Sequence, residues 1–189
     1  MSTIQVPQFL QLLALREIPV RPFTRRGAGD ATRHLQECNE HCFGVAIRQS
    51  DNGFVDSLAL ATTRQVFVIS VEADSSRGIY LSDQPFRNLL EGGAGILVGF
   101  EMAKIALHLR RDLGLNVNGV DLSTLFSPDT RKPWRPSQVL AKALSRSVSI
   151  FEVDGLWNSG AEQGTRTLCL RAWVSWFVDR CTISHLTEV

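Results

Sequence analysis

The chain has 189 residues, of which 44% are hydrophobic and 21% are charged, so it is long enough for one domain with a full core and its composition argues against disorder. The 20 Lys and Arg residues against 19 Asp and Glu residues give a net charge of +1, which excludes a strongly basic coat for duplex nucleic acid and leaves only a local basic patch. No apolar run is long enough to span a bilayer, no signal peptide is recognisable, and the 4 cysteines show no dense disulfide pattern. We expect an intracellular protein, cytoplasmic or nuclear, that has no contact with a membrane.

The first part of the chain predicts two helices with an extended segment between them. Residues 6–16 carry apolar side chains at helical spacing, and two prolines favour an extended form for 17–23. A second helix is expected over 30–41, because Asp30 or Thr32 can satisfy the free N–H groups at its start.

Three strands are expected next. Residues 43–48, 55–61 and 65–71 are apolar and contain many β-branched or aromatic side chains. Turn residues at 51–53 and 62–64 separate them. Such short connections indicate that consecutive strands pair antiparallel.

The rest of the chain alternates between helices and strands. We expect helices over 83–90, 101–113, 137–144 and 165–180, and short strands over 96–100 and 117–122. Three antiparallel strands followed by αβαβ units predict an α/β fold with a mixed sheet and helices on both faces. This is the order of ribonuclease H-like proteins.

The same order, with several local sequences, resembles the RNase D and Werner-type 3′→5′ exonucleases of the DEDD class over residues 18–180. Residues 44–48 (Gly-Val-Ala-Ile-Arg) correspond to the first core strand of that family, which carries Asp-x-Glu. The basic, acidic and apolar residues at 111–113 match the end of a family helix, and 120–122 match the acidic step that follows it. Trp157 stands before the final helix, as a tryptophan does in the family.

The resemblance implies a catalytic centre that this chain lacks. Members of the family hold two divalent metal ions between four carboxylates, which clamp the attacking and leaving oxygens of a phosphodiester. The corresponding residues are Ala46 and Arg48 in the first motif, Ile105 in the second and, counting from Trp157, Val174 in the third. None of them is acidic. We therefore expect a catalytically inactive homologue that is not an enzyme and that binds no metal ion and no other cofactor.

A loop with basic residues is one candidate binding surface. Residues 130–136 contain Arg131, Lys132, Trp134 and Arg135, and cations beside an exposed indole suit a single-stranded nucleic acid such as RNA. The alternative is a rigid proline loop in which Trp134 packs on the domain.

The N-terminal segment is the other candidate. We divide the chain into an N-terminal helical extension, 1–17, and an exonuclease-like domain, 18–189. The extension is apolar at Phe9, Leu12 and Leu13, which favours a homodimer or a protein partner. The alternative is that the helix closes its own core.

These observations favour a scaffold, or a nucleic-acid-binding or partner-binding subunit, of an RNA-processing or RNA-silencing complex, which is the role that the resemblance implies for inactive relatives. One open alternative is an active metal-dependent 3′→5′ exonuclease whose acids are relocated to Glu72, Asp74 and Asp121. Another is a protein–protein interaction module without nucleic-acid contact. Metal-dependent cleavage of a single strand separates the first alternative from the others, and salt-sensitive binding separates the second.

Overall fold

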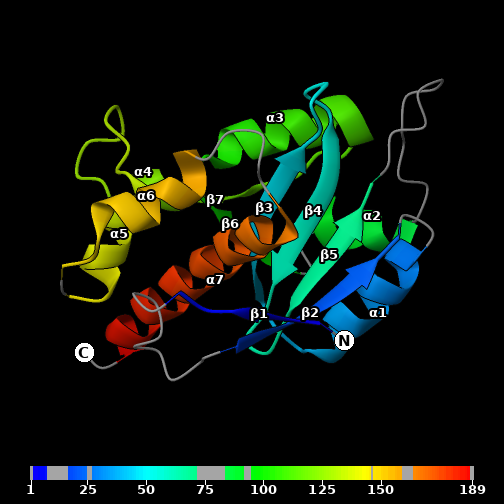
Figure 1. Cartoon of the computed structure of the whole chain (residues 1–189), viewed down its shortest axis with the longest axis horizontal. Helices are drawn as coiled ribbons and strands as arrows, with labels where there is room; N and C mark the ends of the chain where they lie inside the picture. The colour runs from blue at the N-terminus through cyan, green and yellow to red at the C-terminus, as the bar shows by residue number, and fades with distance from the viewer. Residues whose placement is uncertain are drawn as a thin grey trace.

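The structure is a computed structural model that describes residues 2–7, 17–24, 27–71, 84–91, 95–145, 147–158 and 164–187. Its centre is a mixed sheet built from β1 (Ser2–Gln5), β2 (Glu17–Phe23), β3 (Cys42–Gln49), β4 (Val55–Ala61), β5 (Val66–Ser70), β6 (Ile96–Gly99) and β7 (Gly119–Asp121). The 7 strands lie in the order β1-β2-β5-β4-β3-β6-β7, as Figure 1 shows.

The antiparallel meander predicted from the sequence is confirmed. β3 pairs antiparallel with β4, and β4 pairs antiparallel with β5. The first turn contains Gly53 at a φ of +74°, a conformation that glycine adopts without steric cost. Its N–H donates a hydrogen bond of 2.8 Å to the carbonyl oxygen of Ser50. In the second turn the N–H of Thr62 donates to the carbonyl oxygen of Gln65 at 3.0 Å.

Parallel strands extend the sheet on both sides of this meander. β6 pairs with β3 and β7 pairs with β6, while β2 adds parallel to β5. β1 pairs antiparallel with β2, placing Ile4 opposite Ile18, and both side chains are buried. The sequence did not predict β1. Most of the helix expected over 6–16 lies outside the described residues.

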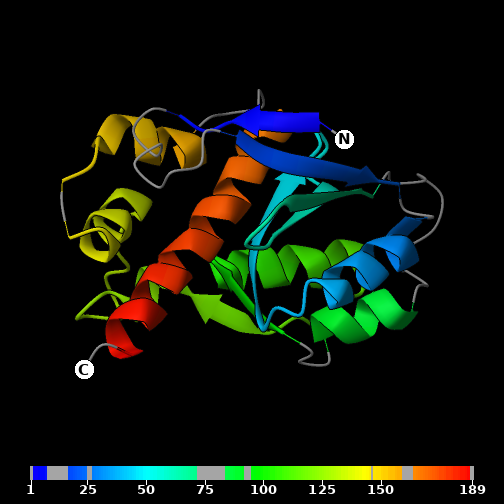
Figure 2. The same cartoon turned by 90° about the horizontal axis from the view of Figure 1, so that it is seen from below.

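Helices cover both faces of the sheet, as predicted. They are α1 (Ala28–Glu37), α2 (Gln84–Glu91), α3 (Met102–Leu113), α4 (Leu122–Leu125), α5 (Pro136–Ala143), α6 (Ile150–Asn158) and α7 (Thr165–Thr187). Figure 2 shows α7 running along one face, with α1 and α2 on the other. In the described part of the chain, no helix has the length and apolar character needed to cross a membrane.

The start of α1 differs from the expectation. Gly27 takes the capping position, and no side chain accepts a hydrogen bond there. Asp30 and Thr32 instead lie inside the helix, where the hydroxyl of Thr32 donates to the carbonyl oxygen of Ala28 at 3.0 Å. The helix therefore begins at Ala28, two residues before the expected start. The spacing of apolar residues in the sequence does not distinguish these two starting points.

Side-chain size separates the two faces of the sheet. Small residues of β3 and β4, including Ala46, Ala59 and Ala61, pack in the core beneath α7. Larger residues alternate with them and pack toward α1, α2 and α3: Phe43, Val45, Leu58 and Leu60. The small residues allow α7 to approach the sheet closely. A Cβ atom on Gly44 would lie 2.0 Å from the carbonyl oxygen of Ala172 in α7.

Candidate functional site

A cavity of about 110 Å³ lies where β3, α3 and α7 meet. We call it the first cavity. Ala46 of β3 and Ile105 of α3 both line it, together with Arg171 and Ser175 of α7. The structure thus brings together two of the residues that the resemblance assigned to the former metal site.

The other two assigned residues lie elsewhere. Val174 of α7 is fully buried and does not line the first cavity, so its assignment to the former metal site stays a prediction. Its neighbour Ser175 lines the cavity, and so does Arg171, one turn earlier. One residue rotates the direction of a helical side chain by about 100°, and counting from Trp157 could not fix that rotation.

Arg48 does not line the first cavity either, and its assignment also stays a prediction. Its Nε atom forms an ion pair of 2.7 Å with Asp56 Oδ1, and its Nη2 atom donates to the hydroxyl of Ser57 at 2.9 Å. Both partners belong to the neighbouring strand β4. A register shift between Arg48 and Gln49 interrupts the alternation of the two strands at this point.

The charges of the first cavity are mainly positive. Arg171 is only 8% exposed, and its Nε atom donates to the carbonyl oxygen of Leu156. Burial lowers the pKa of Arg171 while Glu101 raises it, and a guanidinium stays charged in either case. Lys104 adds a second cation, whose Nζ atom lies 3.5 Å from Glu101 Oε2 with both side chains 62% exposed. Burial, with help from Arg111, lowers the pKa of His108, which favours the neutral imidazole near pH 7.

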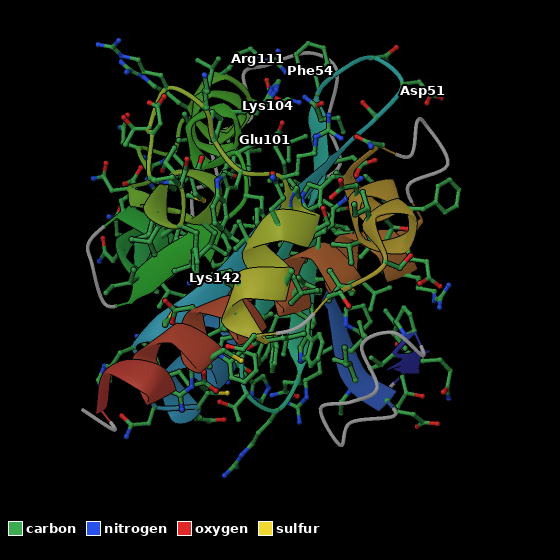
Figure 3. All side chains as sticks on the ribbon, turned by 90° about the vertical axis from the view of Figure 1, so that its left-hand side faces the viewer. Asp51, Phe54, Glu101, Lys104, Arg111 and Lys142 are labelled. Carbon is green, nitrogen blue, oxygen red and sulfur yellow. The ribbon has the colours of Figure 1, made fainter. Side chains whose placement is uncertain are left out.

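Glu101 borders the cavity from an unusual backbone conformation. It precedes α3 with a φ of 57°, in the left-handed region, which costs energy for a residue with a side chain. Its carbonyl oxygen accepts the N–H groups of Lys104 at 2.9 Å and Ile105 at 3.1 Å. Figure 3 labels Glu101 and Lys104 at the start of α3 and Arg111 toward its end, near Phe54 of the turn after β3.

Asp121 has a structural role at the end of β7. Its Oδ2 atom accepts the N–H of Met102 at 2.9 Å, and its Oδ1 atom accepts the N–H of Ser123 at 2.9 Å. One carboxylate therefore caps the starts of both α3 and α4. The other two acids proposed as relocated ligands, Glu72 and Asp74, lie outside the described residues.

A second cavity of about 460 Å³ adjoins the first, sharing Phe100, Glu101 and Trp157 with it. It includes part of the basic loop, because Trp134 and Arg135 line it. Within the same loop, the hydroxyl of Ser127 lies 2.7 Å from the carbonyl oxygen of Asp129 and 2.8 Å from that of Lys132, and its single proton is shared between these two acceptors. These bonds give the loop a fixed form.

The residues of the basic loop differ in exposure. Arg131, Lys132 and Arg135 are exposed, whereas Trp134 is half-buried and packs against the core beneath α7. Part of the Trp134 side chain thus packs on the domain, as the alternative expected, and the rest is exposed. The other candidate surface, at Phe9, Leu12 and Leu13, lies outside the described residues.

The donor groups of the first cavity do not fit a pair of divalent metal ions. Glu101 is the one carboxylate that lines it among the described residues, while Arg171 and Lys104 add positive charge. Hard divalent ions require several oxygen ligands with compensating negative charge. Across the described parts of the chain, no group of three or more His, Cys, Asp or Glu residues is placed to hold a metal ion.

No protein-family model and no curated protein matches the chain by sequence. Solved structures do match its fold. The EXO domain of Aedes aegypti Nibbler has a TM-score of 0.61 and 13% identity, covering 100% of this chain and 94% of that one. The catalytic core of RRP6 from Trypanosoma brucei has a TM-score of 0.60 and 16% identity, covering 98% and 50%.

Brucella melitensis NrnC bound to pGG has a TM-score of 0.57 and 9% identity, covering 88% of this chain and 79% of that one. The chain thus has the mixed α/β fold of ribonuclease H-like exonuclease domains. This exonuclease-like domain spans about half the length of the RRP6 catalytic core.

One prediction from the sequence is contradicted by these comparisons. The chain was expected not to be an enzyme, whereas the structures that share its fold are exonuclease domains, one of them described as a catalytic core.

Proposed function

We propose that this exonuclease-like domain is a binding subunit for single-stranded nucleic acid, and that the first cavity receives a phosphate group of the strand. The observation that carries the proposal is the pair of cations Arg171 and Lys104 at the meeting point of β3, α3 and α7. In the exonuclease family that the sequence resembles, metal ions held by carboxylates would supply the positive charge that a phosphodiester needs. Here the positive charge comes from the side chains themselves.

The size and charge of the first cavity support this role. A volume of about 110 Å³ suits a group as small as a phosphate. A guanidinium and an ammonium form charge-assisted hydrogen bonds with phosphate oxygens. Arg171 is positioned by the carbonyl oxygen of Leu156, so its head group loses less conformational freedom when an anion binds.

The wider surface supports a strand of several nucleotides. Arg131 and Lys132 are exposed on the loop that leads to Trp134, and phosphate contacts from such side chains are independent of base sequence. NrnC, one of the proteins that share the fold, was solved with pGG bound. We extend nucleic-acid binding from that protein to this one as part of the proposal.

The test is anisotropy of a labelled single-stranded RNA of about ten nucleotides, a length that covers one binding groove, in chelator and at low salt. We expect saturable binding by the complete chain. Lys104→Gln should weaken it several-fold, and Arg171→Gln combined with it should abolish it. Lys142→Gln is the matched control, since Lys142 is an exposed lysine of α5 that does not line the cavity.

Two results would overturn the proposal. One is the lack of any saturable binding at low salt. The other is unchanged affinity of Lys104→Gln, with melting temperatures showing that both variants are folded. The same RNA should be followed on a gel with Mn²⁺ and with chelator, because hydrolysis that chelator abolishes would make the strand a substrate and would favour the active alternative.

The assembly in which this subunit works belongs to the proposal as well. We propose a scaffold role in an RNA-processing or RNA-silencing complex, with a protein partner or a second copy of the chain bound at Phe9, Leu12 and Leu13. Each of these points remains a prediction from the sequence.

A further inference from the structure

The second cavity has the opposite electrostatic character to the first. Three carboxylates line it, from Glu101, Asp121 and Asp154, against one guanidinium from Arg135. A negatively charged group such as a phosphate is repelled from such a cavity, and a cation is attracted to it.

The walls of this cavity are aromatic. Phe100, Trp134 and Trp157 line it. The rings of Phe100 and Trp157 pack edge to face, with centroids 4.9 Å apart and an angle of 70° between their planes. The face of an indole attracts a cation more strongly than any other side-chain ring, and a planar guanidinium can also stack on it.

One carboxylate of the cavity has an oxygen without a hydrogen-bond partner. Asp154 of α6 is only 6% exposed, and its Oδ1 atom accepts the N–H of Ser137 at 3.0 Å. Its Oδ2 atom is buried and unpartnered among the described residues, as is the hydroxyl oxygen of the neighbouring Ser137. A buried carboxylate oxygen without a donor costs free energy that a ligand with N–H groups recovers.

We propose that the second cavity binds the side chain of an arginine presented by a polypeptide partner. A guanidinium has five N–H donors, is weakly hydrated and stacks on indoles, so it matches the unpartnered oxygen, the negative charge and the aromatic walls together. The volume of about 460 Å³ admits the whole side chain with neighbouring backbone atoms. A nucleotide fits less well, because the three carboxylates that line the cavity repel its phosphate.

The test uses the complete chain and a blocked short peptide with one arginine between alanines. Binding is followed by the indole N–H signals in ¹H–¹⁵N spectra. We expect the signals of Trp134 and Trp157 to shift on titration, while those of Trp173 and Trp176, which are buried residues of α7, stay in place. The same peptide with citrulline has nearly the same shape without the charge, and we expect it to bind at least about tenfold more weakly.

Asp154→Asn tests the carboxylate itself. The amide oxygen still accepts the N–H of Ser137, while an NH₂ group replaces the unpartnered acceptor. We expect about a tenfold loss of affinity for the arginine peptide. Glu152→Gln is the matched control, because Glu152 is an exposed acid of the same helix that does not line the cavity.

Three results would overturn the inference: equal affinity for the arginine and citrulline peptides, full affinity in Asp154→Asn, or a shift of the same indole signals by single-stranded RNA and not by the peptide. The citrulline comparison needs no variant, so it decides the question even if Asp154→Asn fails to fold. The binding of RNA in the first cavity is tested separately through Lys104, and either result can stand without the other.

Discussion

At the scale of single residues, Asp112 joins two distant parts of the fold. Its side chain is 2% exposed near the end of α3. The carboxylate accepts the N–H of Val55 at the start of β4 at 2.9 Å and also binds Arg111, whose guanidinium lies over the ring of Phe54. α3 is thereby fixed against the turn between β3 and β4, which orients the face of α3 that carries Lys104 and Ile105.

We predict that Asp112→Ala lowers the free energy of unfolding by about 1–3 kcal/mol, because the buried N–H of Val55 loses its acceptor. Asp112→Asn keeps an acceptor oxygen and should cost less. Chemical denaturation of the two variants measures the difference. Equal losses would mean that the charge of Asp112, and not the hydrogen bond to Val55, stabilises this contact.

The pKa of Asp112 gives a second prediction, for pH. Burial raises this pKa. Hydrogen bonds from Arg111 and from the N–H of Val55 together lower it by more than burial raises it, so the pKa lies below its ordinary value. A lowered pKa stabilises the folded state fully above the pKa of an unfolded aspartic acid, about 3.9, and this contribution is lost as the pH falls through the folded value. Thermal melts between pH 7 and pH 3 should therefore show a steeper acid-side loss in the natural chain than in Asp112→Asn. If the melting temperatures of the two proteins fall in parallel with pH, protonation of Asp112 is not the cause of the acid-side loss of stability.

At the scale of elements, α7 decides how the site is assembled. α7 crosses β3 and β4 (Figures 1 and 2) and packs on their small residues. Its residues Arg171 and Ser175 line the first cavity. Gly44 lies at the closest approach. A Cβ atom there would lie 2.0 Å from the carbonyl oxygen of Ala172 and 2.5 Å from the backbone nitrogen of Trp176.

We predict that Gly44→Ala destabilises the fold by about 3 kcal/mol or more, because backbone atoms of α7 must move to admit one methyl group. Gly155→Ala in α6 is the matched control. A Cβ atom there meets no heavy atom within 4 Å, and alanine is the better helix former by about 0.5–1 kcal/mol. Melting temperatures should thus move in opposite directions. A stable Gly44→Ala variant would show that α7 lies farther from β3 than described.

At the scale of the whole molecule, a nearly neutral chain keeps its charges separated. The cations Arg171 and Lys104 line the first cavity, whereas Asp121 and Asp154 line the second, and Glu101 lines both. The net charge of +1 conceals this arrangement. A chain with such a charge can still bind an anion and a cation side by side.

We predict a shallow salt dependence for RNA binding. Each phosphate that is neutralised on a single strand contributes a slope of about −0.7 to the plot of log K against log salt. Lys104→Gln should reduce the slope by about that amount, since it removes one phosphate contact. Affinities measured between 50 and 200 mM salt, the range over which such slopes are taken, test this. A slope as steep in Lys104→Gln as in the natural chain would place the phosphate contacts outside the first cavity.

The sequence by itself determined the antiparallel pairing of β3, β4 and β5, the alternation of helices and strands after them, and the presence of helices on both faces of the sheet. Turn residues such as Gly53, the alternation along β3 and β4 and the period of α3 are local properties, so they are visible in a short stretch of chain. Ala46 and Ile105 could be assigned to one site because the resemblance supplied the spacing between motifs. β1 was missed, since a strand of four residues gains its stability from pairing with β2 and has little signal of its own.

Only the tertiary structure decided which side chains share a cavity. α7 is buried on nearly all sides, so its sequence has no amphipathic stripe from which to read that Ser175, and not Val174, faces the first cavity. One sequence feature indicated which side of α7 faces the cavity: the polar residues Arg171 and Ser175 stand four apart in an otherwise apolar stretch and so share one face of the helix. Trp134, Asp154 and Trp157 meet at the second cavity because α5 and α6 fold back beside α7. That packing depends on contacts between residues distant in sequence, which no local pattern encodes.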